Sequence, residues 1–188
     1  MCDEILCQTQ ARIKRELALR DQSQASLLTF SAADDLHQSE KQQIIVPDFT
    51  WFIPNKLAAL AYPRSADVFT VLRDIGISAL LNLSEAPLPA NSLEKVGLRT
   101  EHIPIVGFIA PGVRQIKQAL TMIDACLEHS MPVGVVGIVH AGVILACYLV
   151  EQGTSAHTAI GIIRQWRSSS LAYAMQEAAV LRYEAALT

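Results

Sequence analysis

The chain has 188 residues, of which 51% are hydrophobic and 18% are charged, and its formal net charge at pH 7 is −3. This length suits one domain of ordinary size, and so high an apolar fraction excludes a disordered chain. The slightly acidic balance, with no cluster of Lys and Arg among aromatic residues, argues against a nucleic-acid partner. We therefore expect a compact α/β domain that binds no nucleic acid.

The four cysteines are Cys2, Cys7, Cys126 and Cys147, and their spacing is not that of metal ligands. Nothing else in the sequence indicates a metal or a cofactor, so none is expected. Cys126 and Cys147 lie in apolar helical patterns, where a cysteine is usually a small core residue. The first ten residues include acidic positions and no continuous apolar run, which is unlike a secretory leader. Reduced cysteines and the lack of a leader predict a cytoplasmic protein.

Residues 1–47 are predicted to stand apart from the rest of the chain. Residues 4–20 have the spacing of an amphipathic helix, and residues 21–43, rich in Ser, Gln and Asp, have few core candidates and are typical of an exposed linker. From Val46 the composition becomes aromatic, apolar and punctuated by proline. We expect a helix and polar linker over 1–47 and one domain over 48–188.

Helical and strand patterns alternate through the domain. The sequence predicts helices over 65–76 (with Ser65 as N-cap and Gly76 as terminator), 112–130, 141–153, 155–167 and 171–187, and strands over 77–85, 96–105 and 131–139. Alternation of this kind predicts a mainly parallel sheet with helices on both faces.

Residues 132–150 require a separate decision, because they carry no Asp, Glu, Lys or Arg and are long enough to cross a membrane. The first half of this stretch is rich in β-branched residues and contains Gly134 and Gly137, its middle holds His140, and only the second half has helical character. A strand followed by a helix is the better interpretation, so no membrane span is expected.

The turn between that strand and helix is the first candidate site, because the N–H groups at a helix N-terminus attract anions. From Gly137 to Gly142 the turn has one titratable residue, His140, and neither a thiol nor an arginine for chemistry on a phosphate ester. His140 is a candidate anion contact or general base. The alternative is a structural histidine that is hydrogen-bonded to the backbone.

Other candidate ligand-binding residues lie at the ends of predicted elements. Glu85 follows a strand and is expected either to line the same crevice or to be a solvated loop carboxylate, and His102 alternates with apolar neighbours as a structural residue would. Arg164 and Arg167 flank Trp166 at a helix end, where cations stabilise the C-terminus whether or not they touch a ligand.

From about residue 49 to residue 183 the chain resembles a small atypical dual-specificity protein phosphatase of the cysteine-dependent class. The resemblance depends on "FTWFIPNKLAALAYPR", "LLNLSE", "HIPIVGFIAP", "PVGV" leading to "GVILACYLV", and "AIGIIRQWR" followed by "QEAAVLRY", all in the family's order. It implies the cysteine-phosphatase fold, a central, mostly parallel mixed sheet flanked by helices, which agrees with the alternation above.

The family's catalytic signature is degenerate in this alignment. The signature is His-Cys, five residues, then Arg and Ser/Thr; here Val136 and Gly137 take the His and Cys positions, His140 takes the Arg position, and the loop is about three residues short. The family's general acid aligns with Gly107. In the late helical region Arg167, Ser170 and the pair at 176 and 177 match family positions. The apolar residues 136–139 are expected to become core.

The resemblance together with these losses implies an inactive phosphatase-like domain that binds a protein partner, phosphorylated or not. The alternative is a phosphatase-family enzyme with atypical or residual phosphate-ester hydrolysis, in which His140 acts as base and Glu85 or Arg167 assists. A membrane or purely structural role is the third possibility.

Overall fold

The computed structural model describes residues 46–187, which form a five-stranded sheet with the strand order β1-β2-β5-β3-β4. The strands are β1 Thr50–Ile53, β2 Leu57–Leu60, β3 Ala79–Asn82, β4 Arg99–His102 and β5 Val133–Val136. Strands β2, β5, β3 and β4 run parallel, and β1 joins the edge as an antiparallel hairpin partner of β2. Strand β5 is therefore central, between β2 and β3.

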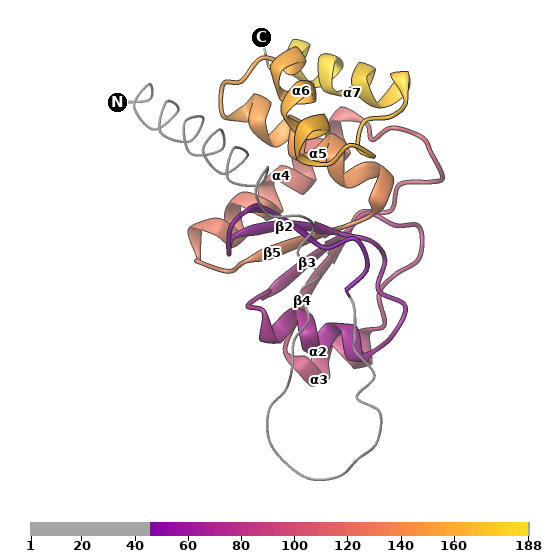
Figure 1. The fold of residues 1–188 in the computed structure, drawn as a ribbon, viewed down its shortest axis with the longest axis vertical. Coiled ribbons are helices and arrows are strands. Elements are labelled where there is room, and N and C mark those ends of the chain that lie inside the picture. Colours follow the sequence, from indigo (N-terminus) through magenta and orange to yellow (C-terminus); the bar gives the residue numbers. More distant parts are fainter. Residues whose placement is uncertain (1–45, 188) are drawn as a thin grey trace.

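Helices cover both faces of this sheet (Figure 1). The helices are α2 Asp67–Asp74, α3 Ala90–Val96, α4 Val113–Glu128, α5 Ile138–Glu151, α6 Ala156–Trp166 and α7 Ala174–Ala185. Helices α2 and α3 lie on one face, and α4 to α7 lie on the other, with α5 packed against both α6 and α7. The α/β fold expected from the alternating pattern, a mostly parallel mixed sheet flanked by helices, is confirmed.

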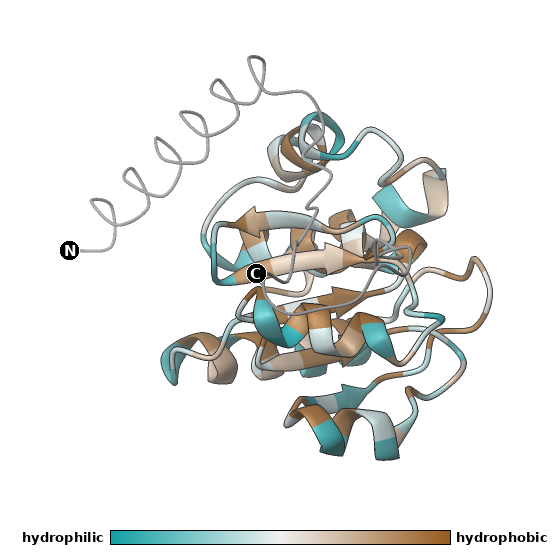
Figure 2. Ribbon diagram, turned by 60° about the horizontal axis from the view of Figure 1, so that its bottom comes forward, coloured by the Kyte–Doolittle hydropathy of each residue, from teal (hydrophilic) through white to brown (hydrophobic). Residues whose placement is uncertain are grey.

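The sheet divides the apolar interior into two clusters. The larger one lies between the sheet and α4 to α7 and includes Ile116, Val135 and Ile144, all without solvent exposure. The smaller one lies under α2 and α3 and includes Phe69 and Leu80. Figure 2 shows the strands at the centre in brown, which is the hydropathy expected for parallel strands buried on both faces.

Most predicted elements are present, with shorter bounds. Ser65 precedes the helical residue Ala66, and its Oγ accepts from the Asp67 N–H at 3.3 Å as the predicted N-cap should; Gly76 ends that region with φ +98° as expected. The prediction that the central strand extends to Val139 is wrong, because β5 ends at Val136 and residues 138 and 139 are helical. Strands β1 and β2 and helix α3 were not predicted.

The segment weighed as a membrane span is divided between β5 and the 14-residue α5. Between Val46 and Leu187, no helix combines the length and the apolar character needed to cross a bilayer. The helix predicted over 4–20 and the linker over 21–43 lie outside the described residues.

Candidate functional site

A single residue, Gly137, separates the central strand from the helix that follows it. Its φ of +136° and ψ of +109° lie in a region that only glycine adopts without strain, and its N–H donates to the Leu60 carbonyl oxygen at 3.0 Å. Helix α5 begins at once with Ile138. The connection is therefore a tight turn that places the α5 N-terminus, with its unpaired N–H groups, at the carboxyl edge of the sheet.

His140, in the first turn of α5, is buried, with 5% of its surface exposed. Its Nε2 lies 3.0 Å from the carbonyl oxygen of Ile109, so Nε2 carries the proton and donates. Burial lowers the pKa of His140, although the bond to Ile109 and the charge of Glu85 partly oppose this shift. At pH 7 the imidazole is neutral, and its Nδ1 is an acceptor rather than a second donor. The interpretation of His140 as a histidine bonded to the backbone at a helix start matches this geometry.

Glu85 and Gly107 meet at the same edge of the sheet. Glu85 follows β3, and its Oε1 accepts a hydrogen bond from the Gly107 N–H at 2.5 Å. Gly107 has φ +53°, a left-handed conformation that suits glycine in the loop before α4. Because the charge of Glu85 acts on His140, these three residues form one neighbourhood at the carboxyl ends of β3 and β5. The structure thus brings together three of the residues singled out in the sequence.

Arg167 lies apart from this neighbourhood. It caps α6 at its C-terminus, only 8% exposed, and its Nη2 pairs with the Asp48 carboxylate at 2.8 Å. Among residues 46–187 no hydrogen bond or ion pair joins it to Glu85 or His140, and its Nη1 has no partner there. The Ser170 hydroxyl is likewise buried without a partner within the described part of the chain. His102, the remaining candidate, contacts the Ser84 carbonyl oxygen at 2.8 Å, as a structural histidine would.

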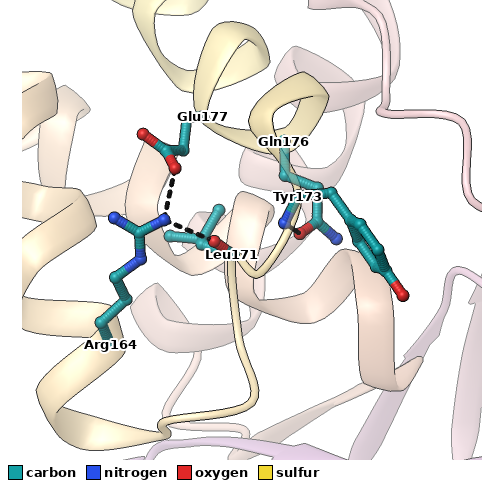
Figure 3. Close-up of polar contacts among 5 residues, drawn as sticks. All are labelled: Arg164, Leu171, Tyr173, Gln176 and Glu177. Atoms are coloured by element: carbon teal, nitrogen blue, oxygen red, sulfur yellow. Dashed lines mark hydrogen bonds and ion pairs between the residues drawn. The ribbon is translucent and has the colours of Figure 1, made fainter.

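The loop between α6 and α7 is attached to the first turn of α5 through Gln176. Its Nε2 donates to the Val139 carbonyl oxygen at 2.8 Å, and its Oε1 accepts from the Tyr173 N–H at 3.1 Å. Arg164 holds the other side of the loop by donating to the Leu171 carbonyl oxygen and pairing with Glu177 (Figure 3). Figure 3 also shows the Tyr173 ring pointing away from these contacts. Neither Asp48 nor Tyr173 was singled out from the sequence.

The expectation that residues 136–139 become core is only partly correct. Val136 and Gly137 are buried, but Ile138 is 46% exposed and Val139 is half-buried. The apolar turn therefore reaches the surface and does not fill a closed interior.

The two thiols in the described residues lie away from the turn. Cys147 faces the core from α5 without exposure, and Cys126 lies buried on α4. Burial raises the pKa of both thiols, most strongly that of Cys147. Both are therefore protonated at neutral pH and are poor nucleophiles.

A family model described as "Polymorphic toxin system, DSP-PTPase phosphatase" matches residues 59–154, about half of the chain. The chain belongs to that family. In this DSP-PTPase family member the matched range runs from β2 to just past α5, so it contains Glu85, Gly107, Gly137 and His140.

Solved phosphatase structures share the fold of this DSP-PTPase family member. Tk-PTP in its active form is 23% identical, with a TM-score of 0.63 over 69% of this chain and 92% of that one. A mouse putative dual-specificity phosphatase, complexed with zinc tungstate, is 19% identical, with a TM-score of 0.62 over 81% of this chain and 94% of that one. Kinase-associated phosphatase, with its catalytic cysteine replaced by serine, is also 19% identical, with a TM-score of 0.62 over 70% and 86%. At such identities the likeness shows the fold.

Proposed function

We propose that this chain is a phosphatase-fold protein without phosphate-ester hydrolase activity and that it acts as a protein-binding module. The observation that carries the proposal is the one-residue connection at Gly137 between β5 and α5. Five residues between a thiolate and an arginine are what the family signature needs to surround a phosphate, and this connection has no room for them.

The side chains around the turn support the same conclusion. No cysteine or arginine lies between Val136 and Gly142, and the nearest thiol along α5, that of Cys147, faces the core. A neutral His140 that donates to Ile109 cannot supply the two parallel N–H donors with which a guanidinium grips a phosphate. Without a nucleophile, only the residual rate from binding and electrostatics remains.

The proposed partner is a protein, and the surface near the turn is apolar rather than cationic. Ile138 is exposed at the start of α5, and Phe108 and Tyr173, whose rings contact each other, have at least half of their surfaces exposed. Exposed aromatic residues of this kind are typical of protein interfaces. The proposal includes a phosphorylated partner, because the N–H groups at the α5 N-terminus can bind a phosphate group.

One observation favours the alternative, an enzyme with residual hydrolysis. The Glu85 carboxylate lies close enough to His140 for its charge to raise the imidazole pKa against the effect of burial. A nearby carboxylate and imidazole are the residue types from which a general base and its orienting group are built.

A turnover assay separates the two functions. The purified full chain is tested with an aryl phosphate and with phosphotyrosine, phosphoserine and phosphothreonine peptides, beside Glu85→Gln, His140→Gln and a heat-denatured control. The proposal expects all four samples to give the same background rate, and the full chain to capture a protein partner without turnover. A rate above background that either substitution abolishes would establish the alternative.

A further inference from the structure

Six large apolar side chains are exposed to solvent on three segments that meet at the first turn of α5. They lie on the loop before α4, at the start of α5 and at the start of α7, and their exposed fractions run from 46% to 64%. We call them the apolar rim: Val106, Phe108, Ile109, Ile138, Tyr173 and Met175.

Contacts link the three parts of the apolar rim. The Phe108 and Tyr173 rings meet edge to face with their centroids 5.8 Å apart. His140 holds the Ile109 carbonyl, and Gln176 ties the start of α7 to Val139 beside Ile138. Exposed apolar side chains that gather on segments held together by such contacts mark an interaction site.

The described chain begins beside the end of α6, from which the loop to Tyr173 departs. Asp48 pairs with Arg167, and the Trp166 Nε1 donates to the Trp51 carbonyl oxygen at 3.0 Å, so the first residues of the domain are fixed to the end of α6. The loop that carries Tyr173 starts at that same point, directly after Arg167. Whatever precedes Val46 therefore enters the domain next to the loop that bears the rim.

The sequence of residues 4–20 predicts an occupant of matching character. In a helical projection of about 100° per residue, Leu6, Ile13 and Leu17 fall within about 40° of one another and form an apolar stripe. Ala11 and Ala18 lie on the opposite face among charged residues. The 25 residues between this segment and Val46 span, as a polar coil, a root-mean-square distance of about 25–30 Å.

We infer that residues 4–20 dock their apolar stripe on the apolar rim of the same chain. A tether of this length gives an effective concentration on the order of 1 mM, so a weak contact with a dissociation constant of about 0.1 mM would keep about nine-tenths of the molecules closed. The same contact between two copies at about 2 µM would be occupied in only a few per cent of molecules. Because residues 4–20 belong to the same chain, they occupy the apolar rim far more often than a second copy of the protein does at this concentration. The inference holds whether or not the turn hydrolyses phosphate, and a protein partner that binds the apolar rim has to displace this segment.

Hydrogen exchange of the full chain tests the inference at a protein concentration of about 2 µM. The stripe variant is Leu6→Asp/Leu17→Asp, and the matched control, with the same added charge on the opposite face, is Ala11→Asp/Ala18→Asp. We expect the backbone amides of residues 106–109 and 172–175 to exchange roughly tenfold more slowly in the wild-type chain and the control than in the stripe variant, as the closed fraction requires.

A reciprocal variant, Phe108→Asp/Met175→Asp, changes exposed rim positions, so it keeps the fold intact and should accelerate exchange within residues 4–20. Equal exchange in the wild-type chain and the stripe variant would overturn the inference. So would protection that appears only at about 200 µM, since that concentration dependence would assign the rim to a second copy. Because the readout is exchange, it fails or succeeds independently of the turnover assay.

Discussion

Replacing Gly142 by alanine should destabilise the domain, although alanine is the better helix former. Gly142 lies buried in α5 under the α6–α7 loop, and a Cβ built on it would lie 2.7 Å from the Cβ of Ser170 and 3.0 Å from its Oγ. Carbon atoms essentially never approach so closely, so the loop or the helix has to shift. Overpacking of this kind costs about 1–3 kcal/mol, whereas alanine in place of glycine contributes about 1 kcal/mol of helix propensity.

The net loss in unfolding free energy is therefore about 1 kcal/mol. Gly161 in α6 is the matched control, since a Cβ there meets nothing within 4 Å and Gly161→Ala should stabilise the domain by about 1 kcal/mol. For a chain of this size the two variants should differ in melting temperature by about 4–8 °C. Urea unfolding followed by tryptophan fluorescence gives the free energies directly.

A double-mutant cycle then identifies the cause. Ser170→Gly removes the Cβ and the Oγ that crowd position 142, so Gly142→Ala should become stabilising in that background, with a coupling energy of about 1–3 kcal/mol. If Gly142→Ala is as stable as Gly161→Ala in the wild-type background, the close approach of α5 and the α6–α7 loop is refuted.

Three further outcomes are expected from single residues of the domain. Gly137→Cys should show no aryl phosphatase activity and should lose about 1–3 kcal/mol of stability, since cysteine is strained at φ +136°; a family-like rate would contradict the short turn. Asp48→Asn should lower the unfolding free energy by about 1–2 kcal/mol, because it leaves Arg167 buried without its counter-charge, while exposed Glu94→Gln should change it by less than about 0.5 kcal/mol. Because the folded-state pKa of His140 is below its usual 6.5, the unfolded chain binds the extra proton first, so stability should fall as pH drops below about 6.5. In urea unfolding across pH 5–7.5, His140→Gln should show a smaller decline than the wild-type chain, and an equal decline would assign the effect to other groups.

The sequence predicted the elements whose local pattern and tertiary role agree. Helix α4 keeps its apolar stripe, and α6 begins at Ser155, whose side chain accepts from the Thr158 N–H as a cap should. Strand β2, in contrast, has the sequence LAAL, without a β-branched or aromatic residue, and it is a strand because β1 and β5 pair with it on both sides. The start of α5 was misplaced because Ile138 and Val139 continue the β-branched run, whereas the backbone at Gly137 ends it.

In the candidate site, too, the residues with a local sequence signal were predicted and those placed by long-range contacts were not. Glu85 and His140 were found because each lies at the end of a predicted element, and parallel strands bring such ends together. Gly107 was found through the alignment with the family's general acid. The Asp48–Arg167 pair spans 119 positions and had no local signal. The exposure of Phe108 and Ile138 was equally invisible, because an apolar side chain has the same sequence signature in a core and on a binding surface.

The attachment of the first strand to the end of α6 also constrains the order of folding. The bonds from Trp166 to Trp51 and from Arg167 to Asp48 close loops of 115 and 119 positions, and β2 finds its parallel partner only when β5 has been made. During synthesis the β1–β2 hairpin therefore leaves the ribosome long before the residues that fix it, and a two-stranded hairpin alone is at best marginally stable. Contacts of such high sequence separation are slow to form, so the sheet should be completed only after α6 emerges. Until then the Leu57–Leu60 strand is an unpaired apolar edge that a chaperone can bind.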